Sequence, residues 1–288
     1  MRNIVITGAT GNVGKALIKQ LGQKTGDFKV WAALKSEAAA QDFLQQYPVE
    51  RIAFDFDVPE SAESALKDCD TLFLLRPPHI SDVKKYFRPL IAAALVQQVK
   101  HIVFLSVQGA ESSSLIPHHK IEKLIVESGI PYTFLRPAYF MQNFSTTLRQ
   151  DLVAHARVFL PAGKAQFTLI DVEDVAAVAA EVLAAPAPHA FQAYALTNNE
   201  QLSFGEMTAV LSEVLGKEIR YISPNLIRFY YKKIAEGIPS AFVLVMIMLH
   251  SLPRFQSVPP LSDWIEKLTG KPPRSFRDFV KAHKALWQ

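Results

Sequence analysis

Residues 2–14 read Arg2-Asn-Ile-Val-Ile-Thr-Gly8-Ala-Thr-Gly11-Asn-Val-Gly14, an apolar run that leads into three glycines spaced three residues apart. The residues that follow have the apolar spacing of a helix. In this context the first glycine permits a sharp turn, the second lets the backbone approach a pyrophosphate, and the third lets helix and strand pack closely. The amides at the helix start would then face the anion. We therefore expect a dinucleotide site here, the alternative being an ordinary glycine-rich turn.

The composition narrows the class of protein. The chain has 288 residues, 49% of them hydrophobic, which suffices for one α/β domain with a smaller appendage. The net charge of +4 comes from interspersed acidic and basic residues, so nucleic acid is not an expected partner. The single cysteine, Cys69, excludes an intramolecular disulfide framework and a cysteine-based zinc site, and no other metal site is expected.

The ends and the apolar runs of the chain favour a cytoplasmic protein. The start of the chain has no signal-peptide pattern, and the single cysteine fits a reducing compartment. The longest apolar run, 241–249, is about half the length needed to cross a bilayer, so we expect no membrane association. We expect it to form a buried helix or the wall of a pocket.

Apolar strand patterns alternate with helical patterns through the first half of the chain. The strands are expected at 2–7, 29–34, 51–54, 70–75, 101–105 and 131–135. This alternation predicts a Rossmann-like, doubly wound parallel sheet with helices on both faces. We expect a dinucleotide-binding domain at 1–150, with 165–186 returning to it, and a smaller, mainly helical substrate or lid domain at 197–288.

Ligands of such sheets lie beyond the carboxyl ends of the strands, so the residues there are the candidate site. Lys35 follows the second strand, where a cation suits the 2′-phosphate of NADP better than the ribose hydroxyls of NAD; otherwise it is a solvated lysine. After the third strand, Asp55 could accept a hydrogen bond from adenine, with Phe56 against the ring, or Asp55 could cap a loop. After the fourth, Arg76 could assist phosphate or substrate binding, or pair with an acid.

The later strand ends hold the catalytic candidates. Ser106 could polarise a carbonyl or bond only the local backbone. His118 could act as acid or base near neutral pH, or be a solvated or capping residue. Residues 136–143 offer an aromatic wall that includes Tyr139, together with Met141 and a polar tip at Asn143. That mixture suits a flat ring and an apolar acceptor, although core packing must account for some of these side chains.

Several motifs together resemble the NmrA-like group of atypical short-chain dehydrogenase/reductases, and the resemblance extends through nearly the whole chain. The motifs are Thr7-Gly-Ala-Thr-Gly-Asn-Val-Gly14, Leu105-Ser106, Ser128-Gly-Ile-Pro-Tyr-Thr-Phe-Leu-Arg-Pro137, Phe140-Met-Gln-Asn143, Asp171-Val-Glu-Asp-Val-Ala176 and Thr269-Gly-Lys-Pro-Pro-Arg-Ser-Phe276. The first motif alone indicates only a dinucleotide fold, whereas the combination is much more specific.

The resemblance implies a Rossmann domain and a small C-terminal domain that closes over a substrate cleft. The family includes NADPH-dependent quinone reductases, triphenylmethane and azo-dye reductases, and regulators without catalytic activity that sense the nicotinamide pool. By position, the family's cofactor contacts correspond to Gly8, Thr10, Gly11, Asn12 and Val13 at the pyrophosphate, Lys35 at the 2′-phosphate, Leu75, Arg76 and Pro77 at the ribose, and Pro137, Ala138, Tyr139 and Phe140 at the nicotinamide.

The sequence departs from the wider superfamily at its Tyr-x-x-x-Lys pair, because those places hold Ser114 and His118. This argues against alcohol or sugar chemistry, which needs the phenol. We predict an NADPH-dependent reductase that passes hydride to a small electron-poor acceptor such as a quinone or dye, with Arg76, Ser106, His118 and Tyr139 facing it. One alternative is a non-catalytic NADP(H) sensor that acts through a protein partner; a weaker one is an NAD-dependent sugar-nucleotide enzyme. A homodimer and a regulatory partner both stay open.

Overall fold

The computed structural model describes residues 1–47, 49–78, 80–114 and 116–288, which form two units. Unit 1 comprises Met1–Pro137, Val172–Leu196 and Trp264–Lys271, and unit 2 comprises Ala138–Asp171, Thr197–Asp263 and Pro272–Gln288. The first boundary therefore falls at Pro137 rather than at 150. The segment Trp264–Lys271 belongs to unit 1, although we had expected all of 197–288 in the C-terminal domain.

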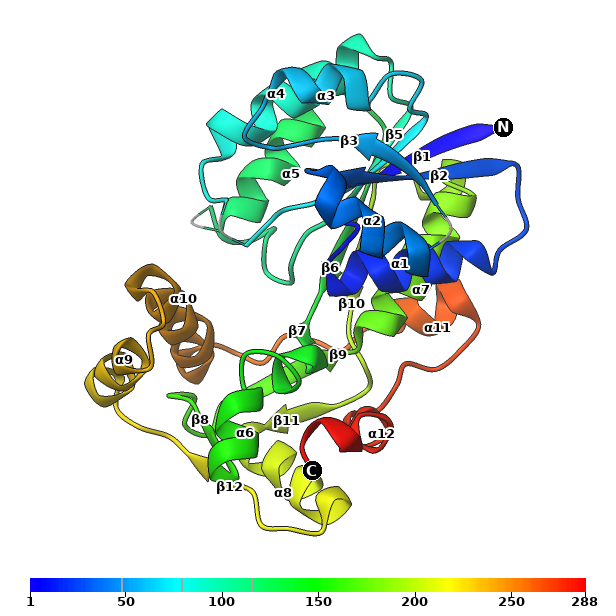
Figure 1. Ribbon diagram of the computed structural model, residues 1–288. Helices are drawn as coiled ribbons and strands as arrows, with labels where there is room; N and C mark the ends of the chain where they lie inside the picture. Colours follow the sequence, from blue (N-terminus) through cyan, green and yellow to red (C-terminus); the bar gives the residue numbers. More distant parts are fainter. Residues whose placement is uncertain (48, 79, 115) are drawn as a thin grey trace. The chain divides into compact units, whose positions relative to one another are not determined.

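Unit 1 is built on a seven-stranded parallel sheet in the order β10-β6-β5-β4-β1-β2-β3 (Figure 1). Its strands are β1 (Arg2–Ile6), β2 (Phe28–Leu34), β3 (Glu50–Ala53), β4 (Thr71–Leu75), β5 (His101–Leu105), β6 (Tyr132–Pro137) and β10 (Gln192–Leu196). Its helices are α1 (Asn12–Gly22), α2 (Glu37–Gln46), α3 (Glu60–Ala65), α4 (Val83–Val96), α5 (Pro117–Ser128), α7 (Val172–Ala184) and α11 (Trp264–Thr269). The predicted doubly wound α/β class is confirmed.

The strand order reverses beside β1, which pairs with β2 on one side and with β4 on the other. The buried Thr7 joins the carboxyl ends of β1 and β4: its backbone N–H donates to Phe73 O at 3.0 Å, and its hydroxyl accepts from Leu75 N at 2.8 Å. Ligands of doubly wound sheets bind at such a reversal. The fold therefore places the glycine-rich turn and the residues after β4 at the expected site.

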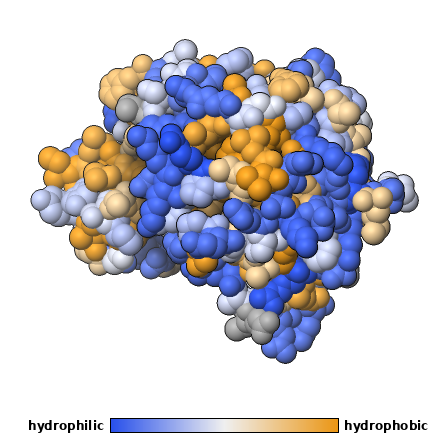
Figure 2. Space-filling view, turned by 90° about the horizontal axis from the view of Figure 1, so that it is seen from above, coloured by the Kyte–Doolittle hydropathy of each residue, from blue (hydrophilic) through white to orange (hydrophobic). Residues whose placement is uncertain are grey.

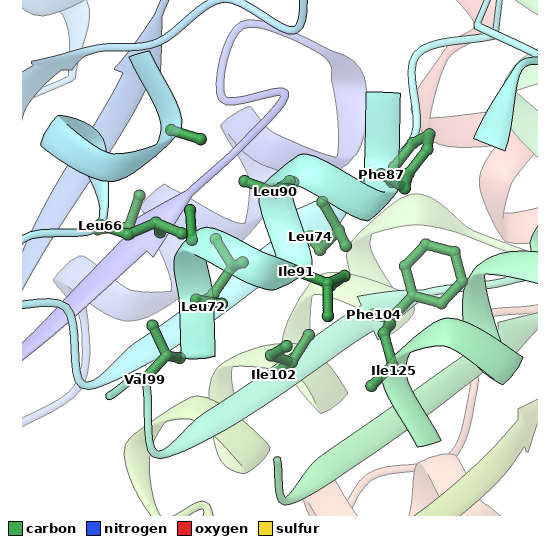
Figure 3. Close-up of a cluster of buried hydrophobic side chains, with 14 of the residues drawn as sticks. Leu66, Leu72, Leu74, Phe87, Leu90, Ile91, Val99, Ile102, Phe104 and Ile125 are labelled. Atoms are coloured by element: carbon green, nitrogen blue, oxygen red, sulfur yellow. The ribbon is translucent and has the colours of Figure 1, made fainter. Parts of the chain in front are cut away.

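The core of unit 1 lies between the sheet and the pair α4 and α5, while α1 and α7 pack together on the opposite face (Figures 1 and 3). Leu72 and Leu74 alternate along β4 and point toward this core, where they meet Leu90 and Ile91 of α4. Asp82 is the N-cap of helix α4, and its carboxylate accepts a hydrogen bond from Lys85 N at 3.0 Å. Its apolar residues recur at helical spacing, so one face of α4 is buried as the periodicity predicts.

Unit 2 combines helices with two small sheets. One sheet has the order β11-β9-β7, and the other pairs β12 with β8. Its elements are β7 (Tyr139–Phe140), α6 (Arg149–His155), β8 (Arg157–Phe159), β9 (Gln166–Ile170), β11 (Gln201–Ser203), α8 (Phe204–Leu215), β12 (Arg220–Ile222), α9 (Leu226–Ala235), α10 (Ser240–Ser251) and α12 (Phe276–Ala282). Strands β7, β8 and β11 were not expected. Helix α8 begins with a capping box, in which Ser203 and Glu206 bond each other's backbone N–H groups.

A buried charge network ties α6, β8 and α9 together inside unit 2. The carboxylate of Asp151 lies 2.7 Å from Lys233 Nζ and 2.9 Å from Arg157 Nη2, and Lys233 Nζ also lies 2.7 Å from a Glu236 oxygen. Burial alone would raise the pKa of Asp151, but the two cations hold that pKa below its usual value. Asp151 is therefore ionised in the native state at neutral pH.

Helix α10 is only partly buried, so the first alternative for this apolar run, a buried helix, is wrong, and the second, the wall of a pocket, stays a prediction. Val243, Met246 and His250 form its buried stripe, whereas Leu244 and Met248 are 57% and 49% exposed. Further exposed apolar side chains on this helix are Phe242, Val245 and Leu249. Figure 2 shows the resulting hydrophobic surface in orange at the left, where Figure 1 draws α9 and α10. Within the described ranges, the structure has no helix that is both long and apolar enough to span a bilayer.

Candidate functional site

The glycine-rich turn between β1 and α1 forms a cradle that side chains would fill. Gly8 has a φ of +65°, which favours glycine, and a Cβ there would lie 2.9 Å from Leu75 Cδ2. A Cβ on Gly14 would lie 2.3 Å from Gly8 O and 2.6 Å from Ala9 Cα, both backbone atoms. The turn can therefore keep its shape only with glycine at position 14.

The start of α1 directs free backbone amides beyond this cradle. Its first i→i−4 bond runs from Lys15 N to Gly11 O at 2.9 Å, so the amides of residues 12–14 precede the helical ladder. Gly11 and Asn12 are exposed. A positive helix end whose first residues are exposed, without a Cβ in the way, fits a dinucleotide pyrophosphate. The predicted contacts of residues 8–13 with that group stay a prediction with this geometric support.

Lys35 lies at the edge of the sheet with two carboxylates. Its Nζ is 3.1 Å from Asp55 Oδ2 and 2.9 Å from Asp57 Oδ2. The hydrogen bonds with Asp57 and Asp55 raise the pKa of Lys35, and the bond from Lys35 lowers the pKa of Asp57. Lys35 is therefore charged and could bind an anion, but Asp55 and Asp57 would compete with that anion for its ammonium group. Asp57 was missed at the sequence level, although it stands two residues from Asp55.

The predicted adenine contacts have structural roles in this region. Asp55 Oδ1 accepts from Asp57 N at 2.9 Å, so Asp55 does cap its loop, and its hydrogen bond from adenine stays a prediction. Phe56 is half-buried and packs against the rings of Phe54 and Phe87, with centroids 4.8 and 5.4 Å away. Much of the Phe56 ring therefore packs in the core, and its contact with an adenine ring stays a prediction.

Arg76 and His118 lie together at the carboxyl end of β4. The guanidinium Nε donates to His118 Nε2 at 3.3 Å, and Nη1 donates to the carbonyls of Pro77, Pro78 and Ile80. The His118 ring stacks over Phe104, with ring centroids 5.9 Å apart. Burial, with the Arg76 charge adding to it, lowers the pKa of His118 to about 3. His118 is therefore neutral at physiological pH and accepts at Nε2, so it is not a ready proton donor there.

Ser106 belongs to a buried polar cluster. Its hydroxyl donates to Glu122 Oε1 at 2.5 Å, and the same carboxylate binds the Arg136 guanidinium through two bonds of 3.0 and 2.7 Å. Ser106 is 1% exposed and Glu122 is 6% exposed. Because the single proton of the Ser106 hydroxyl is used by Glu122, the structure does not support Ser106 as a group that polarises a carbonyl. A glutamate on the buried face of α5 was the sequence signal for such a partner.

The predicted residues after β6 lie in unit 2. His250 Nδ1 donates to Met246 O at 2.6 Å, so Nε2 is free to accept from the Tyr139 hydroxyl at 3.1 Å. Burial raises the pKa of Tyr139, which Asn143 also contacts. Met141 is fully buried in the core of unit 2, so our expectation that it faces the acceptor is not supported. The link between Tyr139 and His250 was not predicted, since 110 intervening positions separate them in the chain.

The two positions that replace the superfamily's catalytic pair are Ser114 and His118. Ser114 is exposed in the loop before α5, and His118 is in the first turn of that helix. The neighbouring His119 bonds Ala110 O through Nδ1 at 2.7 Å, which ties the start of α5 to the loop after β5. Neither replacement offers an ionisable phenol.

The parallel sheet with its reversed strand order and the glycine cradle before α1 define a dinucleotide-binding α/β protein. The chain belongs to the NmrA-like family, whose model matches residues 1–262. It is 31% identical over 288 residues to the NAD(P)H azoreductase of Xenophilus azovorans, covering 99% of both chains. It is 29% identical to quinone oxidoreductase 2 of Escherichia coli, covering 76% of both chains. The family predicted from the combined motifs is thereby confirmed.

The solved structures agree with this assignment. The triphenylmethane reductase of Citrobacter sp., complexed with NADP(H), has a TM-score of 0.86 and 26% sequence identity, covering 97% of this chain and 99% of that one. The similarity extends over nearly the entire length, so unit 2 as well as unit 1 has a counterpart in that reductase.

Proposed function

We propose that this protein is an NADPH-dependent reductase that passes hydride to a small, flat, electron-poor acceptor such as a quinone or a dye. The cradle formed by Gly8 and Gly14 at the start of α1 supports dinucleotide binding. The activities named for its relatives, azo-dye, quinone and triphenylmethane reduction, support this class of acceptor.

The hydrogen bonds of the three candidate proton donors favour an acceptor that needs no protein acid. His118 is neutral and accepts a hydrogen bond from Arg76, Ser106 donates to Glu122, and the Tyr139 hydroxyl donates to His250. Reduction of a carbonyl to an alcohol needs a positioned acid, whereas a quinone or dye accepts hydride with little such help. When bound, NADPH supplies the hydride. The chain's share is to bind, to orient and to exclude water.

Steady-state oxidation of NADPH against a panel of quinones, azo dyes and triphenylmethane dyes tests this proposal. We expect turnover with at least one acceptor and none with simple ketones or alcohols. If NADP⁺ binds tightly in calorimetry but no acceptor supports turnover, the alternative of a non-catalytic NADP(H) sensor is favoured. If neither nicotinamide dinucleotide binds, both proposals are wrong.

We further propose that the cofactor is NADP(H) rather than NAD(H), with Lys35 at the 2′-phosphate. The complex of the related reductase with NADP(H) supports the first part, and the exposure of Lys35 beyond β2 supports the second. Two acids surround this lysine, so phosphate binding must compete with Asp55 and Asp57 for it. The preference is therefore expected to be moderate.

Changing Lys35 to methionine should weaken NADP⁺ binding by on the order of tenfold, since a charged partner of the 2′-phosphate is lost, while NAD⁺ binding stays within twofold. The variant Asp57→Asn should act in the opposite direction, because it removes a competing and repelling charge. Calorimetric Kd values for both dinucleotides measure these effects. Equal Kd changes for NADP⁺ and NAD⁺ in the Lys35 variant would show that the lysine serves only the acids around it.

A further inference from the structure

We infer that Arg76 makes the acceptor site selective for anionic aromatic acceptors, those that carry a carboxylate or sulfonate, over neutral and cationic ones. This inference rests on the proposed function and adds the charge of the acceptor to it. It excludes cationic triphenylmethane dyes as preferred acceptors.

The charge of Arg76 is not compensated by any acid among the described residues. Its partners there are a neutral imidazole and three backbone carbonyls. Two other half-buried arginines, Arg136 and Arg157, are each paired with a buried carboxylate, Glu122 and Asp151. A guanidinium that is partly removed from water without a counter-ion attracts an anion. At the carboxyl ends of the strands, where Lys35 already has two acids, Arg76 is therefore the cation more ready to receive a ligand carboxylate or sulfonate.

The guanidinium is also held in one orientation. The bonds to the described residues use Nε and Nη1, and none of them uses Nη2. A fixed guanidinium loses little conformational freedom when it binds a planar anion. His118 lies in the first turn of the 12-residue helix α5, whose positive end adds to the potential at this place.

The position of Arg76 separates it from the proposed cofactor phosphates. In the sheet, β4 lies between β1 and β5. The cradle follows β1, and Lys35 follows β2, farther along the same side. Arg76 instead contacts His118 of the helix that follows β5, on the other side of β4. Because the diphosphate and the 2′-phosphate have their binding groups on the β1 side, the anion left for Arg76 is the acceptor.

A matched pair of acceptors tests this inference: 1,4-naphthoquinone and its 2-sulfonate, with saturating NADPH. In the variant Arg76→Met we expect the KM for the sulfonate to rise at least about tenfold, as for loss of one charge-assisted pair, and kcat/KM for the neutral quinone to stay within twofold. Comparing each acceptor between variants cancels the difference in redox potential between the two quinones. Arg76→Lys should keep part of the selectivity, since it retains the charge but not the fork.

Arg88→Met is the control, because it removes the same charge from an exposed position of α4 in the same unit. It should change neither KM. Circular dichroism and the melting temperature check folding, and Arg76→Gln replaces the methionine variant if that one does not fold.

Three outcomes would overturn the inference. In Arg76→Met these are an equal loss of kcat/KM with both quinones, a higher Kd for NADP⁺, and an unchanged KM for the sulfonate. None of the three contradicts the proposed reductase activity. If the wild type turns over neither quinone, the proposed function fails instead. Calorimetry with naphthalene-2-sulfonate in the presence of NADP⁺ then tests Arg76 alone: binding that is lost in Arg76→Met supports the site, and binding that is absent from the wild type rejects it.

Discussion

Replacing Gly14 with alanine is expected to remove NADP⁺ binding almost completely. The added Cβ would lie 2.3 Å from Gly8 O and 2.6 Å from Ala9 Cα, and neither backbone atom can move away as a flexible side chain would. The turn must open, which displaces the amides at the start of α1. Losing two hydrogen bonds to a charged pyrophosphate costs on the order of 3 kcal/mol, or about 100-fold in Kd. Calorimetric titration with NADP⁺ measures this loss.

Gly22→Ala is the matched control for this prediction. Gly22 ends the same helix, and a Cβ there would meet no atom within 4 Å. NADP⁺ affinity should be unchanged in this variant, and stability should be equal or slightly higher because alanine is the better helix former. If Gly14→Ala binds NADP⁺ as tightly as the wild type does, the cradle does not hold the pyrophosphate and the proposed site is wrong.

Changing Asp151 to asparagine is expected to destabilise unit 2 by about 3 kcal/mol, because it leaves the buried Lys233 with Glu236 as its remaining carboxylate. Such a loss lowers the melting temperature by roughly 6–12 °C in a protein of this size. The double variant Asp151→Asn/Lys233→Met should be more stable than the single variant, since the unpaired buried cation is gone. Thermal and urea unfolding measure these differences.

The exposed pair between Glu213 and Arg277 provides the control, since solvent screens it and Glu213→Gln should leave the melting temperature nearly unchanged. The contribution of Asp151 also depends on pH. Its native pKa is below the usual value of 3.8, so the stabilisation is complete well above that pH and is lost as the pH falls through the native pKa. Equal stability of Asp151→Asn and the wild type at pH 7 would contradict this account.

Much of unit 1 could be predicted because its signals are local. Strand, turn and helix follow one another along the chain, and the strand ends name the residues at the carboxyl edge, Lys35 and Arg76 among them. The partners of those residues could not be predicted, because they depend on which side chains the fold brings together. Lys35 pairs with Asp55 and Asp57, which follow β3. Ser106 donates a hydrogen bond to Glu122 of α5.

Unit 2 was less predictable for two physical reasons. Strands β7, β8 and β11 have two or three residues each, too few for an alternating pattern to be recognised. The apolar run in α10 was expected to be buried because hydrophobicity usually predicts burial, yet much of this helix is exposed. Segment 264–271 joins the other unit by long-range packing, which no local pattern records.

The uncovered face of α10 has a practical consequence for measurements on this protein. Sulfate and phosphate buffers strengthen hydrophobic association, so at high concentration they would promote self-association of the protein through Leu244, Met248 and their neighbours. A salt titration designed to screen Arg76 would then report aggregation together with ionic screening. Sodium chloride, with light scattering recorded on the same samples, keeps the two effects apart.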